Sequence, residues 1–142
     1  MRPVRQCGRL LSMSDYTVSR LEDSPDVLGD YPGEMRFLTP QLECEQVALT
    51  WRRMPPDTGG RGSYGHFHKT QEEVYLVVSS TLTFKCGDDV FEAGPGTAVR
   101  VPPETPRSVH NDTGEDVVLV MTSVKLEDYS DEIGKTDDFW PA

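Results

Sequence analysis

The most constraining feature of the sequence is its middle part, residues 46–125, where short runs rich in β-branched residues are each interrupted by a turn sequence. Helical periodicity is absent there, and this pattern is typical of a β-sandwich or barrel. The intervening sequences PPDTGGRG, GDD, AGPG and PPETP supply glycines and prolines suited to tight reversals, which predicts antiparallel neighbours. We therefore predict an all-β antiparallel barrel with eight strands, at residues 46–54, 64–68, 73–79, 81–86, 90–93, 97–101, 107–111 and 117–125.

The chain has 142 residues, the length of one domain, and two flanks lie outside the predicted barrel at 46–125. Residues 13–45 contain three prolines and scattered acids, so we expect an N-terminal arm of extended segments or short strands packed on the barrel. Residues 126–142 are an acidic C-terminal tail in which one short helical turn is expected. Residues 1–12 are basic and precede every strand signal, and we interpret them as a flexible tail or an upstream-start extension without an assigned function.

The charge and the cysteines restrict the partners and the compartment. Fourteen basic residues against 24 acidic ones give a formal charge of −10, which repels phosphate backbones and anionic lipids, so neither nucleic acid nor a membrane is expected as a partner. The three cysteines fit no disulfide framework or zinc knuckle, and no apolar run reaches the roughly 20 residues of a membrane helix. We therefore expect a cytoplasmic protein with reduced thiols.

Two of the three histidines stand as His66-Phe67-His68, directly after a glycine-rich loop. Alternate side chains of a strand share a face, so both imidazoles are expected to point the same way. Glu73 opens the next strand after a short connection, which brings its carboxylate near the imidazoles, whereas Glu72 alternates outward. Two imidazoles and one carboxylate form a donor set that holds Fe(II) and also suits Mn, Ni or Zn, so these residues predict a divalent metal site.

The spacing of these residues resembles the first sequence motif of the cupin superfamily, G-x5-H-x-H-x3,4-E-x6-G. Gly60, His66, His68 and Glu73 match that motif, and Ser80 replaces its last glycine. The resemblance covers residues 46–125 and implies a compact single-domain cupin, that is, a jelly roll or double-stranded β-helix. It also implies a homodimer, formed through edge strands or through the proline-rich segment 24–45.

The second cupin motif, G-x5-P-x-G-x2-H-x3-N, is matched by Gly96, Pro102 and Asn111, whereas Glu104 replaces its inner glycine and Arg107 replaces its histidine. In the family that histidine is usually a fourth metal ligand, and a guanidinium cannot ligate because it offers only donors. Three arrangements follow. In the first, the other three residues hold a metal alone and Arg107 clamps a carboxylate or phosphate of a substrate. In the second, Arg107 pairs with Glu73 in a metal-free cavity that binds an anion, and in the third the site is vestigial.

A small, anionic organic molecule is therefore the expected ligand, with Arg107, Tyr75, Trp51 and Arg53 as candidate binding residues. The third histidine, His110, lies three residues after Arg107 and is expected on the opposite face as a surface or loop residue. Cupins include oxygenases, isomerases, epimerases and decarboxylases, so one hypothesis is a metal-dependent enzyme of such a class. The other is a non-catalytic carrier or sensor, and the absence of a general base besides the ligands favours it.

Overall fold

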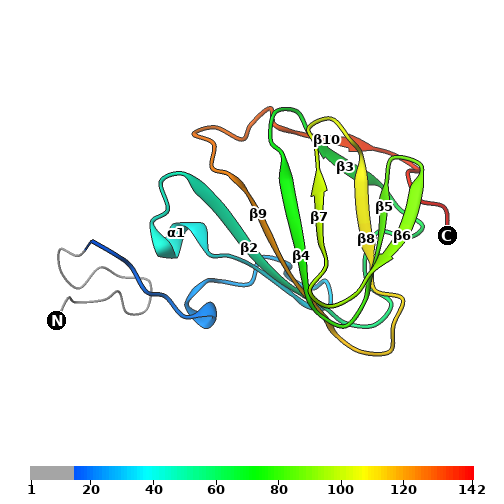
Figure 1. Ribbon diagram of the computed structural model, residues 1–142, viewed down its shortest axis with the longest axis horizontal. Helices are drawn as coiled ribbons and strands as arrows, with labels where there is room; N and C mark the ends of the chain where they lie inside the picture. Colours follow the sequence, from blue (N-terminus) through cyan, green and yellow to red (C-terminus); the bar gives the residue numbers. More distant parts are fainter. Residues whose placement is uncertain (1–14) are drawn as a thin grey trace.

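The computed structural model describes residues 15–142, which form two five-stranded antiparallel sheets that face each other (Figure 1). The first sheet has the order β1-β2-β9-β4-β7 and the second β10-β3-β8-β5-β6. The strands are β1 (Glu34–Phe37), β2 (Val47–Met54), β3 (Gly65–His68), β4 (Glu73–Ser79), β5 (Leu82–Cys86), β6 (Asp89–Ala93), β7 (Ala98–Val101), β8 (Arg107–His110), β9 (Val117–Val124) and β10 (Ile133–Thr136). This is the jelly-roll arrangement expected from the sequence.

All eight predicted strands are present, and their ends agree with the prediction to within one residue. The flanks supply the other two strands. The N-terminal arm contributes β1, which pairs with β2, and two short helices, η1 (Leu21–Asp23) and α1 (Thr39–Leu42), of which α1 lies beside β2 (Figure 1). The expected helical turn after Leu126 was wrong, because the tail instead forms β10 and pairs with β3.

Alternation along the strands divides the space between the sheets into a core and a cavity. The inward residues of β9 change from apolar to polar along the strand, from Val117 and Leu119 in the core to Ser123 at the cavity. The same change occurs along β4, from Val77 to Glu73, which faces Ser123 in register. The core is filled by buried apolar side chains, among them Met54, Tyr75, Leu82, Phe84 and Val101. Burial of these residues supplies the main stabilisation and leaves the polar ends of the strands to line the site.

The two positions at which the sequence departs from the motif glycines have left-handed backbone. Ser80 has φ of 62° and Glu104 has φ of 70°, a region that glycine enters without steric cost. Gly60, in contrast, is required by close packing, since a Cβ there would lie 1.8 Å from Ser108 Oγ. The turns of the motif are therefore retained even where the glycine is not.

Two further findings concern the whole described chain. Among residues 15–142, no helix has both the length and the apolar character needed to cross a membrane. Cys44 and Cys86 are free thiols. The segment 1–12, predicted to be a tail or an extension, lies outside the described residues.

Candidate functional site

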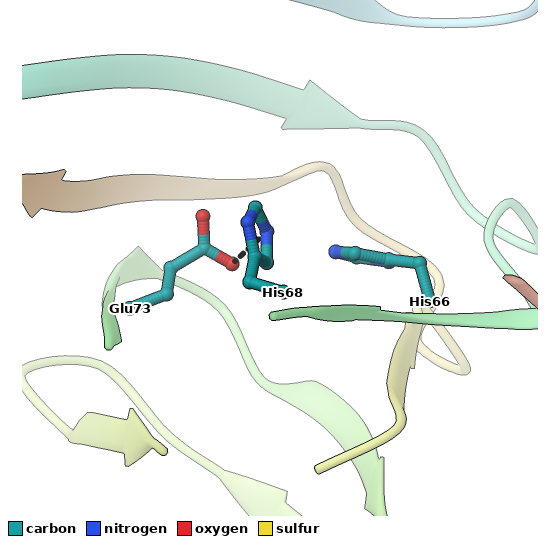
Figure 2. Close-up of side chains that lie close together, drawn as sticks. All are labelled: His66, His68 and Glu73. Atoms are coloured by element: carbon teal, nitrogen blue, oxygen red, sulfur yellow. Dashed lines mark ion pairs between the residues drawn. The ribbon is translucent and has the colours of Figure 1, made fainter. Parts of the chain in front are cut away.

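The three predicted ligands come together at one end of the space between the sheets. His66 and His68 project from the same face of β3, and Glu73 begins β4 opposite them, so that the three side chains point toward one another (Figure 2). One donor atom from each residue lies within 4.8 Å of the others. Within the cluster, His68 Nε2 and Glu73 Oε1 lie 3.7 Å apart. The HxH alternation and the short connection to Glu73 therefore produce the cluster that the sequence predicted.

The tautomer of His68 follows from its hydrogen bonds. The side-chain amide of Gln71 donates to the carbonyl of Val124 at 2.6 Å, which turns its Oε1 toward His68 Nδ1, 2.9 Å away. His68 Nδ1 must then carry a proton and donate it, so in the neutral imidazole the lone pair is on Nε2, on the side of Glu73. An imidazole oriented in this way is ready to ligate a metal.

Gln71 is 1% exposed and is held by a carboxylate from the C-terminal tail. Glu132 accepts hydrogen bonds from the backbone N–H groups of Thr70 and Gln71, both at 2.9 Å, and from the Thr70 hydroxyl at 2.5 Å. Burial alone would raise the pKa of the Glu132 carboxyl, but these hydrogen bonds outweigh it and lower the pKa. Glu132 is therefore an anion that orders the loop between β3 and β4.

His66 is neutral in this environment. Burial of the ring, together with the nearby positive charge of Arg107, lowers the pKa of His66 to about 4. A neutral imidazole is the form that binds metals. The ring centroids of His66 and His68 lie 5.4 Å apart, nearly perpendicular to each other.

Arg107 lies beside this cluster, at the position expected from the second motif. It faces His66 in register across the β3–β8 pair and is 0% exposed. Its nitrogens are all engaged: NH2 donates to Glu73 Oε1 at 3.3 Å, Nε to the Tyr75 hydroxyl at 3.3 Å, and NH1 to the carbonyl of Thr105 at 3.0 Å. The ion pair with Glu73 matches the second arrangement considered for the sequence, and Arg107 does not line the cavity.

Tyr75 lines the cavity and contacts the core at the same time. Its ring packs edge-on against Phe84, and its hydroxyl oxygen accepts the hydrogen bond from Arg107. Burial, together with the negative charge of Glu73, raises the pKa of the Tyr75 hydroxyl well above its usual value. Tyr75 therefore stays protonated at neutral pH.

A cavity of about 870 Å³ lies over the cluster. His66, His68, Glu73 and Gln71 line its inner end. The N-terminal arm, to which the sequence assigned no site role, supplies much of its apolar wall through Leu28, Tyr31, Met35, Phe37 and Pro40. Additional lining comes from β2, β8, β9 and the segment after β9, with Ala48, Thr50, Arg52, Val109, Met121, Lys125 and Tyr129 among the residues.

Trp51 and Arg53, predicted as binding residues, do not line the cavity. The pleat of β2 turns Thr50, Arg52 and Met54 inward, so their neighbours face outward, and Arg53 pairs with Glu34 and Asp116 on that side. The prediction that Trp51 and Arg53 face inward was therefore wrong by one residue, and Arg52 lines the cavity instead.

His110 was expected on the surface, and this was wrong. It is 6% exposed, because the loop after β2 and the C-terminal segment cover it. Its Nε2 lies 3.2 Å from Asp57 Oδ1, and its ring packs near Trp140. Its role is structural and separate from the histidine cluster.

The donor set fits a divalent metal ion. Metal bonds to nitrogen and oxygen are about 2.0–2.2 Å long, so the donors of a bound ion lie roughly 3 to 3.5 Å apart. The observed limit of 4.8 Å needs only a small side-chain adjustment to reach that separation. Glu73 keeps free lone pairs in spite of the bond from Arg107, because a carboxylate accepts at both oxygens.

Comparison with known proteins places this geometry in a family. Residues 52–123 match the protein-family model described as the cupin domain. None of the curated proteins compared matches the chain in sequence.

Solved structures with the same fold are numerous. The polyketide cyclase RemF from Streptomyces resistomycificus is 18% identical with a TM-score of 0.66, over 87% of this chain and 85% of that one. A sugar phosphate isomerase from Silicibacter pomeroyi is 15% identical with a TM-score of 0.61, over 78% and 80%. A protein from Acidithiobacillus ferrooxidans is 21% identical with a TM-score of 0.59, and the alignment covers 67% of this chain but only 60% of that longer one. At these identities the likeness concerns the fold alone.

Proposed function

This chain belongs to the cupin domain family, and from that premise we propose that it binds a divalent metal through His66, His68 and Glu73 and acts on a small anionic organic molecule held in the cavity. One observation carries the proposal: three metal-type donors converge at the inner end of a cavity large enough for an organic ligand. Small-molecule chemistry also appears in the names of two neighbours, a polyketide cyclase and a sugar phosphate isomerase.

The residues around the cluster support metal binding by their protonation states. Gln71 selects the neutral tautomer of His68 whose lone pair is on Nε2, and burial keeps His66 neutral. When bound, an ion of the Fe, Mn, Ni or Zn type supplies a Lewis acid or, for iron, a site for O2. Tyr75 also lines the cavity here, and its hydroxyl stays protonated beside the carboxylate of Glu73. A metal-dependent enzyme is therefore the function that the geometry supports best.

A second candidate is a metal-free binding module, and the ion pair between Arg107 and Glu73 favours it. Arg107 places a positive charge next to the donors, which opposes the binding of a cation. In this case the cavity serves a carrier or a sensor for the anionic ligand.

Elemental analysis of protein purified without added metal distinguishes the two candidates. We expect about one equivalent of a first-row divalent metal in the wild type, and its loss in the His66→Ala, His68→Ala double variant. Glu73→Gln should also reduce the metal content, whereas Glu72→Gln, the neighbour that pairs with Arg100 at the surface, is the matched control and should not. If the double variant retains as much metal as the wild type, the ion binds elsewhere. A wild type without metal would favour the binding module.

A further inference from the structure

Arg52 is an arginine of the cavity wall without a counter-ion. Six of the seven arginines in the described residues 15–142 form an ion pair with a carboxylate, and Arg52 is the exception. Its Nε is buried and has no hydrogen-bond partner among the described residues. Buried polar groups are normally paired, and buried charges almost always are, so this side chain calls for an explanation.

The surroundings of Arg52 contain no acidic group that would balance it. Burial lowers the pKa of the Arg52 guanidinium, and the groups that counter this effect are the hydroxyls of Tyr31, Tyr75 and Tyr64. Arginine nevertheless remains protonated in proteins, so a full positive charge faces the cavity. The nearest carboxylate in the cavity wall, Glu73, is already paired with Arg107. An anionic ligand is the partner that would satisfy Arg52.

The other residues of the cavity wall indicate the chemical nature of the rest of the ligand, beyond its anionic group. Met35, Phe37, Val109 and Met121 offer apolar contacts, and one further cation, Lys125, lies in the lining. Hydroxyl groups such as those of Thr50, Ser108 and Ser123 also line the cavity, but apolar surface predominates in the wall and favours a ligand with an apolar body over a polyhydroxylated one. A carboxylate matches the planar fork of an arginine with a single negative charge.

We propose that Arg52 anchors the carboxylate of a small organic acid whose body is largely apolar and packs against the N-terminal arm and β9. The inference rests on the proposed function for the cavity as a ligand site, but it does not require a metal. The anchor and the histidine cluster line one cavity, so an acid held by Arg52 would share that cavity with the candidate metal site. Arg52 therefore takes the anion-binding role for which Arg107 and Arg53 were candidates.

The test uses matched probes of known chemistry on the full chain. Benzoate, 3-phenylpropionate and 2-naphthoate are titrated calorimetrically, with 3-phenylpropionamide and phenyl phosphate as the neutral and the phosphorylated counterparts. The variants are Arg52→Gln and, as the control, Arg53→Gln, which removes the same charge from the adjacent residue outside the cavity. Each titration is repeated after chelator treatment and in the His66→Ala, His68→Ala variant.

At least one of the acids should bind the wild type and Arg53→Gln with the same affinity, and Arg52→Gln and the amide should each weaken binding roughly tenfold or more. The ligand-free Arg52→Gln protein should melt no lower than the wild type, since it loses an unpaired buried charge, which shows that the variant is folded. Binding should also persist without the histidine cluster.

Other outcomes overturn the inference. The inference fails if Arg52→Gln binds the acids as tightly as the wild type does, or if the wild type binds the amide as tightly as the acid. It also fails if phenyl phosphate binds more tightly than the acids with the same dependence on Arg52, or if no acid binds. If binding is lost with the histidine pair but not with Arg52, a metal holds the acid; the proposed function then stands and this inference fails. If the protein purifies without metal and binding of the acid depends on Arg52, this inference stands and the metal-dependent function fails.

Discussion

Two interactions compete for the carboxylate of Glu73. It is a ligand of the candidate metal centre, and it is also the carboxylate that balances the fully buried charge of Arg107. A bound cation would lie close to that guanidinium, and the repulsion between them weakens metal binding. In the absence of metal the same ion pair satisfies both side chains. We therefore expect Arg107 to influence how readily the site binds a metal.

Two substitutions of Arg107 separate its charge from its position. Arg107→Gln removes the repulsion and should tighten binding of Zn²⁺ roughly tenfold. Arg107→His also removes the repulsion and adds an imidazole at the position that faces His66, so it should tighten binding by at least another tenfold. Both metal-free variants should lose about 1–3 kcal/mol of unfolding free energy, because Glu73 and Tyr75 lose a charged donor.

Competition titrations with a zinc chelator and chemical denaturation of the metal-free proteins measure these effects. Weaker zinc binding in Arg107→Gln would contradict the expectation, and it would mean that Arg107 holds Glu73 in the ligating orientation. Equal affinities of the two variants would show that position 107 is too far from the ion to supply a ligand.

At the scale of single residues, the sequence predicted the cluster of His66, His68 and Glu73 better than it predicted the cavity wall. His66 and His68 share a face whatever the exact start of the strand, because their spacing of two is itself the period of the pleat. The choice between Arg52 and Arg53 depends instead on whether the even-numbered or the odd-numbered residues of β2 face inward. The run VALTWRRM has apolar residues at both even and odd positions. Only the pairing of β2 with β9 decides it.

Among the elements, β10 shows how a segment remote in sequence supports the site. It pairs with β3, the strand that carries both histidines, and residue Glu132 at its start accepts the hydrogen bonds of the loop that contains Gln71. Gln71 in turn orients His68. The C-terminal segment therefore acts on a candidate metal ligand through two successive contacts.

Replacing Glu132 tests this support. Glu132→Gln should lower the unfolding free energy by roughly 2–4 kcal/mol, since the amide cannot accept all the bonds that the buried carboxylate accepts. Zinc affinity should fall about ten- to a hundredfold, as expected when the partner that orients a ligand is disturbed. Asp131→Asn is the control, because Asp131 is exposed and pairs with Lys69 at the surface, and it should change neither quantity. Unchanged zinc affinity in a destabilised Glu132→Gln protein would restrict Glu132 to a structural role.

The strands that sequence reasoning missed, β1 and β10, are the outer members of the two sheets. Each has four residues, EMRF and IGKT, too few to show an alternating pattern, and each borders a segment rich in acids, glycine or proline. Their strand conformation comes from pairing with β2 and β3 rather than from local preference. The other eight strands, which include the edge strands β6 and β7, could be recognised from their own sequences without their partners.

For the molecule as a whole, the formal charge of −10 contrasts with the cavity. Arg52, Arg107 and Lys125 lie in or beside the site, with Glu73 as the acid near the two arginines. An organic anion is thus repelled at long range and attracted at short range. Salt screens the long-range repulsion much more than the contact with a buried guanidinium, so affinity for an acid should depend little on ionic strength.

The same charge allows a test of the first twelve residues. They contain Arg2, Arg5 and Arg9 and no acid, so their deletion changes the formal charge from −10 to −13. The strands and cavity-lining residues of the described part of the chain, residues 15–142, are formed without this segment. At low salt the added repulsion should lower the midpoint of thermal unfolding by no more than about 2 °C, and 0.5 M NaCl should abolish the difference, because the Debye length is then only about 4–5 Å. Metal content should be that of the full chain. A decrease of several degrees that persists in high salt cannot come from charge repulsion, and it would show that residues 1–12 contribute packing to the barrel.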